Sequence, residues 1–250
     1  MYNRPEYIES DPIQVPHRFS RKEDVETAAF LAASIAWGQR KSIINNANRL
    51  MVLMDNAPYD FIINSDPETE WKHFEGFVHR TFNAEDCLFF LASLRNIYLH
   101  HGGLETVFSK GYSIENNVYG ALKYFREVFL SLPHAERVRK HLSDVTNNSA
   151  AKRLNMFLRW MLRKDDSAVD FGLWNAIPMS ALMLPLDVHS GDVSRALGIL
   201  QRKQNDWKAV EEVSAVLRSF DANDPVRYDY ALFGIGVFDN KKTFLNKPVY

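Results

Sequence analysis

The chain has 250 residues, of which 46% are hydrophobic and 24% charged. This composition is typical of a folded globular protein with one large or two small domains, and it excludes disorder over most of the chain. The single cysteine, Cys87, excludes an internal disulfide framework, a zinc site built on several thiolates and a protein-bound iron–sulfur cluster. We therefore expect no cofactor. The sequence has neither an apolar stretch long enough to span a membrane nor the basic and apolar regions of a signal peptide, so we expect a cytoplasmic protein.

Basic residues are concentrated in one segment, although the whole chain carries a formal net charge of only −1. Residues 137–164 contain eight Lys or Arg and one acidic residue, Asp144, which gives a local charge of +7. A segregated basic segment is what binding to phosphate requires, because each phosphate that is neutralised releases counterions. The alternative is a basic helix face that is simply solvated.

Helical periodicity extends from residue 22 almost to the C-terminus, and we find no convincing strand pattern. The alanine-rich start of the first helical region is apolar nearly all round, which predicts a central helix enclosed by others. Ser20 and Glu23 have the spacing of a capping box, and Gly38 indicates a break in the helix. We expect helices over residues 23–37, 40–54, 57–64, 71–77, 84–100, 104–109, 114–130, 150–163, 173–179, 188–197, 207–220 and 225–238.

These helices predict an all-α fold, with residues 1–250 forming a single helical domain. Pro5, Pro12 and Pro16 predict extended or turn geometry for the first 19 residues, whose apolar side chains would anchor them to the surface. Within the domain we expect two lobes, residues 20–182 and residues 1–19 plus 183–250. The cleft between the lobes would contain Asp187 and the basic segment.

The segment from Pro185 to Gly198 is the most informative part of the sequence. A proline and Asp187 precede a helix that ends at Gly198. On the structural interpretation, Asp187 is the N-cap of this helix and Gly198 is the left-handed residue that closes it. That interpretation does not account for His189 and Arg195 in the same frame.

The motifs Leu186-Asp-Val-His189 and Arg195-Ala-Leu-Gly198 resemble the Asp-x-His and Arg-x-Leu-Gly signature of the helix-hairpin-helix DNA glycosylase superfamily, which includes endonuclease III and the archaeal 8-oxoguanine glycosylases. Residues 26–39 are similar to its first barrel helix, and residues 230–236 to its late Ala-Leu-x-x-x-Gly helix. The superfamily's glycine-rich hairpin is replaced here by residues 175–183. Taken whole, the chain looks most like a bacterial family of conserved proteins without assigned function that shares Tyr-Asn-Arg-Pro, Ala-Trp-Gly and Pro-Leu-Asp-x-His.

The glycosylase resemblance implies that Asp187 is the catalytic carboxylate. An ionised carboxylate at a helix N-terminus stabilises the cationic sugar that forms as a glycosidic bond breaks. Lys152 opens a helix that resembles the lysine-bearing helix of the archaeal enzymes, which makes it the candidate amine for a Schiff base with the sugar. The alternative is that Lys152 is a solvated residue in the first turn.

The resemblance also indicates a base pocket and a DNA-binding face. A base flipped out of the duplex is held between aromatic or apolar faces, and the candidates are aromatic side chains in or beside the matching segments, together with two polar neighbours. They are Trp37, Gln39, Trp160, Trp174 and His189. Tryptophans at helical spacing are more often core residues. The candidates for DNA backbone contacts are Arg139, Lys140, Arg153, Arg159, Arg163 and Lys164, because few acidic residues lie near them in the sequence.

Two functional hypotheses follow from the sequence. In the first, the chain is a DNA-binding protein of the glycosylase type that excises a damaged base without a metal. In the second, it is a helical scaffold without catalytic activity that binds nucleic acid or a protein, and Asp187 serves only as an N-cap.

Overall fold

The computed structural model describes residues 3–237, which form two units. The N-terminal unit comprises Ile8–Ser143, and the described part of the C-terminal unit comprises residues 3–7 together with residues 144–237. The described residues are mostly helical, as the sequence predicts, with one two-stranded sheet. None of the described helices is long and apolar enough to cross a lipid bilayer. The expected division into lobes 20–182 and 1–19 plus 183–250 stays a prediction.

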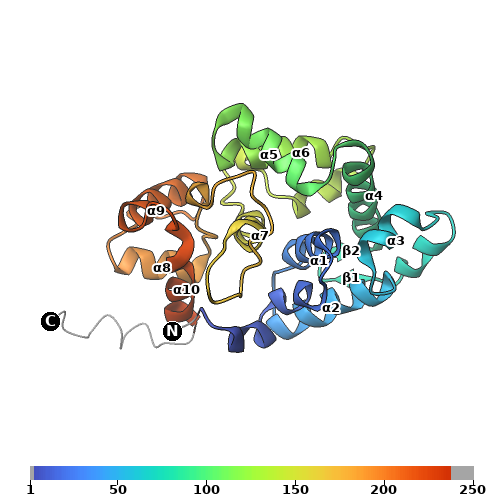
Figure 1. Cartoon of the computed structure of the whole chain (residues 1–250), viewed down its shortest axis with the longest axis horizontal. Helices are drawn as coiled ribbons and strands as arrows, with labels where there is room; N and C mark the ends of the chain where they lie inside the picture. The colour runs from blue at the N-terminus through green and yellow to red at the C-terminus, as the bar shows by residue number, and fades with distance from the viewer. Residues whose placement is uncertain (1–2, 238–250) are drawn as a thin grey trace. The chain divides into compact units, whose positions relative to one another are not determined.

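The N-terminal unit holds six α-helices and a small hairpin (Figure 1). The helices are α1 (Lys22–Ser34), α2 (Arg40–Leu53), α3 (Pro58–Asn64), α4 (Ala84–His100), α5 (Leu104–Glu115) and α6 (Val118–Phe129). Strands β1 (Val78–His79) and β2 (Phe82–Asn83) pair antiparallel, with Val78 opposite Asn83 and His79 opposite Phe82. The sequence does not predict this hairpin because strands of two residues are too short to show an alternating pattern.

The core of the N-terminal unit forms around α1. The alanines of this helix are buried, which confirms the prediction of an enclosed central helix. Phe30 on α1 meets the rings of Phe90, Phe125 and Phe129, with centroid distances of 6.0, 5.5 and 5.4 Å. These rings come from α4 and α6, so burial of aromatic surface joins three helices that are distant in sequence.

The start of α1 differs from the prediction. Its N-cap is Arg21, which makes no side-chain capping bond, so the predicted capping box of Ser20 and Glu23 is wrong. Glu23 instead pairs with Arg21 at 3.3 Å. Upstream, the first residues form three short 3₁₀ helices, Pro5–Ser10, Pro12–Gln14 and Pro16–Arg18, so of the extended or turn geometry that the prolines predict, turn geometry is observed. Each begins at a proline, whose fixed φ suits the first position of a helical turn.

The C-terminal unit holds α7 (Lys152–Leu162), α8 (Val188–Ala196), α9 (Trp207–Phe220) and α10 (Asp229–Val237) (Figure 1). Its core contains Phe157 and Trp160 of α7 and Val213 of α9. The remaining described helical segments of the chain are short 3₁₀ helices: Glu70–Phe74, Glu136–His141, Val145–Asn147, Met179–Ala181 and Pro225–Tyr228.

The helix predicted over residues 173–179 is wrong. That segment runs along the end of α7 rather than forming local turns, because the backbone N–H groups of Phe171 and Trp174 donate to the carbonyls of Trp160 and Met161 at 2.8 and 3.0 Å. The helix predicted over residues 71–77 is only the 3₁₀ helix Glu70–Phe74. The predicted end of the last helix, Phe238, lies outside the described residues.

Candidate active site

Asp187 is the N-cap of α8, which confirms the structural interpretation of this residue. Pro185 precedes it, and the backbone of Asp187 is extended, with φ −127° and ψ −170°. The Ser190 backbone N–H donates to Asp187 Oδ1 at 2.9 Å, and the Asp187 N–H donates to Ser190 Oγ at 3.0 Å. This reciprocal capping box fixes the position of the carboxylate at the positive end of the helix dipole.

Lys152 reaches the same carboxylate from α7. It is the first residue of that helix, after Ala151 in the left-handed conformation with φ +46°. Lys152 Nζ lies 3.0 Å from Asp187 Oδ2, and the two side chains remain 33% and 15% exposed. The ammonium also lies 5.6 Å from the ring centroid of Phe233 on α10. Thus Asp187 caps its helix through one carboxylate oxygen and pairs with an amine through the other.

The pKa of the Asp187 carboxyl is lowered by its surroundings. Burial is the largest influence and by itself raises the pKa, but the charge of Lys152 and the Ser190 N–H together outweigh it. Asp187 is therefore held as a carboxylate. Such a group stabilises positive charge well and is a weak proton acceptor.

Arg195, the first residue of the Arg-x-Leu-Gly motif, has a structural role beside Asp187. Its Nη2 donates to Asn205 Oδ1 at 2.6 Å, and Asn205 Nδ2 donates to the backbone carbonyl of Asp187 at 3.0 Å. A Cβ at Gly191 would lie 2.7 Å from Asn205 Oδ1, so only glycine leaves room for this contact. Arg195 and Gly191 therefore hold the loop that orients Asp187.

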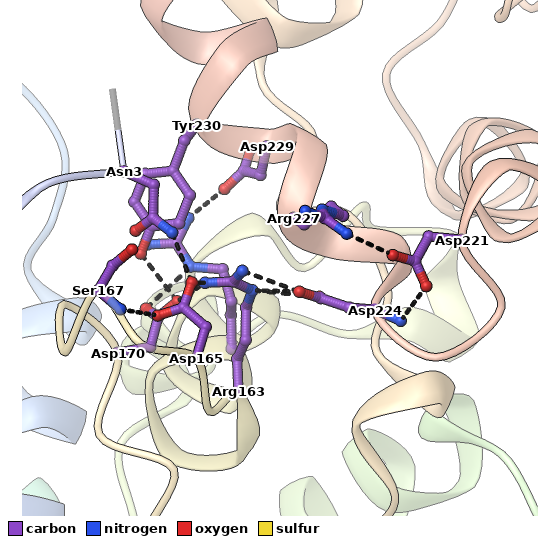
Figure 2. A network of polar contacts seen from close by, with 11 residues as sticks. Asn3, Arg163, Asp165, Ser167, Asp170, Asp221, Asp224, Arg227, Asp229 and Tyr230 are labelled. Carbon is purple, nitrogen blue, oxygen red and sulfur yellow. Dashed lines mark hydrogen bonds and ion pairs between the residues drawn. The ribbon is translucent and has the colours of Figure 1, made fainter. Parts of the chain in front are cut away.

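Two of the expected DNA-binding residues lie inside a buried ionic network (Figure 2). Arg159 pairs with Asp170 at 3.2 Å and with Asp229. Arg163 pairs with Asp165, Asp170 and Asp224 at 2.7, 3.2 and 2.8 Å. The inference that few acids lie near these arginines is wrong, because Asp170, Asp224 and Asp229 are brought to them by the fold.

The network also includes Tyr230 and the N-terminal segment. Tyr230 Oη donates to Asp170 Oδ2 at 2.8 Å, and its ring lies 4.4 Å from the Arg159 guanidinium carbon. Asn3 donates to Asp165. Burial raises the pKa of Asp229, and the negative charge of Asp187 raises it further. The positive charge of Arg159 lowers this pKa but offsets the rise only in part. Asp187 and the network therefore interact electrostatically.

The other basic candidates differ in exposure. Lys164, Arg139 and Lys140 are exposed, and Arg139 lies 3.5 Å from Glu136. Burial lowers the pKa of Arg153 to about 10. Residues 137–143 belong to the N-terminal unit and residues 144–164 to the C-terminal unit, so the basic segment is divided between two units.

The candidate base-pocket residues belong to two units and differ in burial. Trp160 and Trp174 are 0% and 2% exposed, and Trp174 packs edge-on against Phe157. Their burial favours the core alternative, which we adopt. Trp37 and Gln39 belong to the N-terminal unit, where the Trp37 ring stacks on His141 at 5.8 Å. His189 is exposed on α8, with its ring 6.1 Å from that of Phe233.

Sequence reasoning missed three residues of this site: Phe233, Asn205 and Asp229. Phe233 lies in the segment that resembles the late glycosylase helix, and Asp229 directly precedes that segment. The two residues are one helical turn apart, and this spacing is the signal that could have identified them as one face. Asn205 lies in a loop, and no sequence pattern marks it. Within residues 3–237 there is no group of three or more His, Cys, Asp or Glu side chains that could hold a metal ion.

A family model described as a protein of unknown function (DUF2400) matches residues 11–238. The chain belongs to this family. The match is compatible with the resemblance to a family without assigned function. No curated protein and no solved structure matches the chain. The resemblance to the glycosylases therefore depends on the motifs alone.

Proposed function

We propose that this protein binds DNA and excises a damaged base, with Asp187 as the catalytic carboxylate and Lys152 as the candidate nucleophile. The observation that carries the proposal is the 3.0 Å separation of Lys152 Nζ and Asp187 Oδ2 at the start of α8, with both side chains partly exposed. An amine and a carboxylate at one accessible point are the two groups that cleavage of a glycosidic bond uses.

Asp187 would act as an ionised group. When the bond between C1′ of the sugar and the base nitrogen breaks, its electron pair leaves with the base and positive charge develops on the sugar. The lowered pKa of Asp187 suits stabilisation of this charge better than proton abstraction. The reaction needs no metal.

Lys152 would attack the same carbon. Its Nζ must first lose a proton to solvent to expose the lone pair that forms the bond to C1′. The bond between C1′ and the ring oxygen then breaks, the ring oxygen takes that electron pair and a proton from the nitrogen, and the protonated imine forms. Because Nζ is already beside Asp187, the carboxylate keeps the amine close to the carbon that becomes positive.

DNA binding would use the exposed basic residues rather than the buried ones. We expect Lys164→Glu, and separately Arg139→Glu with Lys140→Glu, to weaken binding to unrelated duplexes alike. The slope of log affinity against log salt should flatten by about one unit per lost phosphate contact. Fluorescence anisotropy at several salt concentrations measures both quantities. Unchanged affinity and slope would exclude these residues from the interface.

The second candidate function is a scaffold that binds nucleic acid or protein without catalysis. The capping box of Asp187 and Ser190 favours it, because it explains the aspartate without any chemistry. The non-helical course of residues 171–178 favours it as well, since no helical hairpin precedes Asp187 there.

Base release separates the two functions. The wild-type protein is incubated with duplexes and single strands that contain a panel of damaged bases, and borohydride is added to a parallel sample. The proposal predicts release from at least one substrate, and a trapped adduct that is lost in Lys152→Met. Release without trapping would remove only Lys152 from the mechanism, with water as the nucleophile. No release from any substrate would leave the scaffold function.

A further inference from the structure

Helix α10 contacts the helix that carries Lys152 at two points. Asp229 and Phe233 are four residues apart and therefore share one face of α10, while Lys152 and Arg159 are seven apart and share one face of α7. Asp229 pairs with Arg159, and the Phe233 ring lies 5.6 Å from Lys152 Nζ. These two contacts fix the register of α10 along α7.

The other end of α10 contacts the helix that carries Asp187. A Cβ at Gly236 would lie 2.9 Å from the Cβ of His189 and 3.0 Å from its carbonyl oxygen, so the two helices touch at their backbones. The Phe233 and His189 rings also meet edge-on. His189 follows Asp187 by two residues, so α10 abuts the first turn of α8.

We propose that α10 sets the separation of Lys152 and Asp187, and that Asp229 is a positioning residue which acts through its ion pair with Arg159. Phe233 joins the two halves of this arrangement, because its ring contacts both Lys152 and His189. The inference rests on the proposed function only for its catalytic consequence. The arrangement itself is tested without activity.

The pKa of Asp187, followed by carboxyl ¹³C NMR, reports the separation directly, because Lys152 lowers it. Both Asp229→Ala and Asp229→Asn remove the same charge, but asparagine retains an oxygen that accepts from Arg159. Loss of a nearby negative charge alone would affect the Asp187 pKa equally in both variants: it would lower that pKa, or leave it unchanged where Asp229, whose own pKa is raised, is already protonated. If Asp229 instead holds α10 in position, the Asp187 pKa should rise in Asp229→Ala toward the ordinary value of about 3.9. It should rise less in Asp229→Asn.

Asp224→Ala is the matched control. Asp224 is 8% exposed, against 5% for Asp229, and it binds Arg163 of α7 rather than Arg159. This variant should leave the Asp187 pKa unchanged although it disturbs the same network.

Gly236→Ala supplies an independent variant in case Asp229→Ala does not fold. The added methyl group must displace the His189 backbone, so we expect the Asp187 pKa to rise here too. Equal lowering in both Asp229 variants, or an unchanged pKa in Asp229→Ala and Gly236→Ala, would overturn the proposal. If the wild type releases no base but these shifts occur, the proposed function fails and the positioning role of α10 stands.

Discussion

Arg163 is buried among carboxylates, and this burial gives it a structural role. Its guanidinium is bound by carboxylates on three sides, and its side chain is only 3% exposed. The pKa of Arg163 is raised: burial lowers it, but the hydrogen bonds that Arg163 donates to Asp224 and the nearby negative charges outweigh that effect. An arginine in this setting holds α7 to the loop between α9 and the 3₁₀ helix Pro225–Tyr228.

We therefore expect Arg163→Met to cost about 3 kcal/mol or more of unfolding free energy, because Asp224 would remain buried without its partner. Lys164→Met, a change at the adjacent exposed residue, should alter stability by no more than about 0.5 kcal/mol. Urea unfolding of the two variants measures the difference. Similar stabilities would contradict the assigned role of the network.

The carboxyl group of Asp206, at the start of α9, makes the stability of the fold depend on pH. The hydrogen bond from Arg202 is the main cause that lowers the pKa of this N-cap carboxyl to about 2, with a further contribution from the Ala209 N–H. A folded-state pKa below the ordinary value of about 3.9 stabilises the fold above pH 4, and this stabilisation is lost as the pH falls toward 2. Wild type should thus exceed Asp206→Asn in stability at pH 6, and the difference should shrink at pH 3. Urea midpoints at the two pH values, with exposed Asp166→Asn as background, measure this, and a constant difference would contradict it.

At the scale of elements, helices α5 and α6 lie side by side with a close backbone contact (Figure 1). A Cβ at Gly111 would lie 2.6 Å from the Cβ of Tyr124 and 2.7 Å from the carbonyl oxygen of Gly120. Gly111→Ala should therefore destabilise the protein by about 1–3 kcal/mol despite alanine's better helix propensity. Gly76→Ala is the control, because its Cβ would meet only Arg49 Nη2, at 3.7 Å. Equal melting temperatures for the two variants would show that α5 and α6 can separate without cost.

Helix bounds could be predicted where the signals are local. The spacing of apolar residues predicts α4 and α9 to their observed ends, and their N-caps, Asn83 and Asp206, are local as well. The sequence predicts that α5 ends at residue 109, but it continues to Glu115, where Asn116 in the left-handed conformation and the N-cap Asn117 of α6 set the boundary. The non-helical course of residues 171–178 depends on hydrogen bonds to α7, which no local pattern reveals.

At the scale of the whole molecule, the site also combines features that local sequence predicts with contacts between residues distant in the chain. The residues adjacent to Asp187 predict that it is an N-cap. No local pattern predicts that Lys152 lies beside it, and only a family resemblance makes Lys152 a candidate for the same site. The ion pairs of Arg163 with Asp224 and of Arg159 with Asp229 could not be predicted, because these aspartates lie 61 and 70 residues along the chain. Counting acids near an arginine in sequence says little about a folded chain in which tertiary contacts supply its partners.

The most direct test of the proposed function compares base release and stability in Asp187→Asn. Asparagine retains a capping oxygen, so the unfolding free energy should fall by no more than about 1 kcal/mol. The charge that faces Lys152 disappears, so the rate of base release from the responsive substrate should fall by about 100-fold or more. Full activity in Asp187→Asn, or no release by the wild type from any damaged duplex or single strand, would contradict the assignment of Asp187 as a catalytic residue.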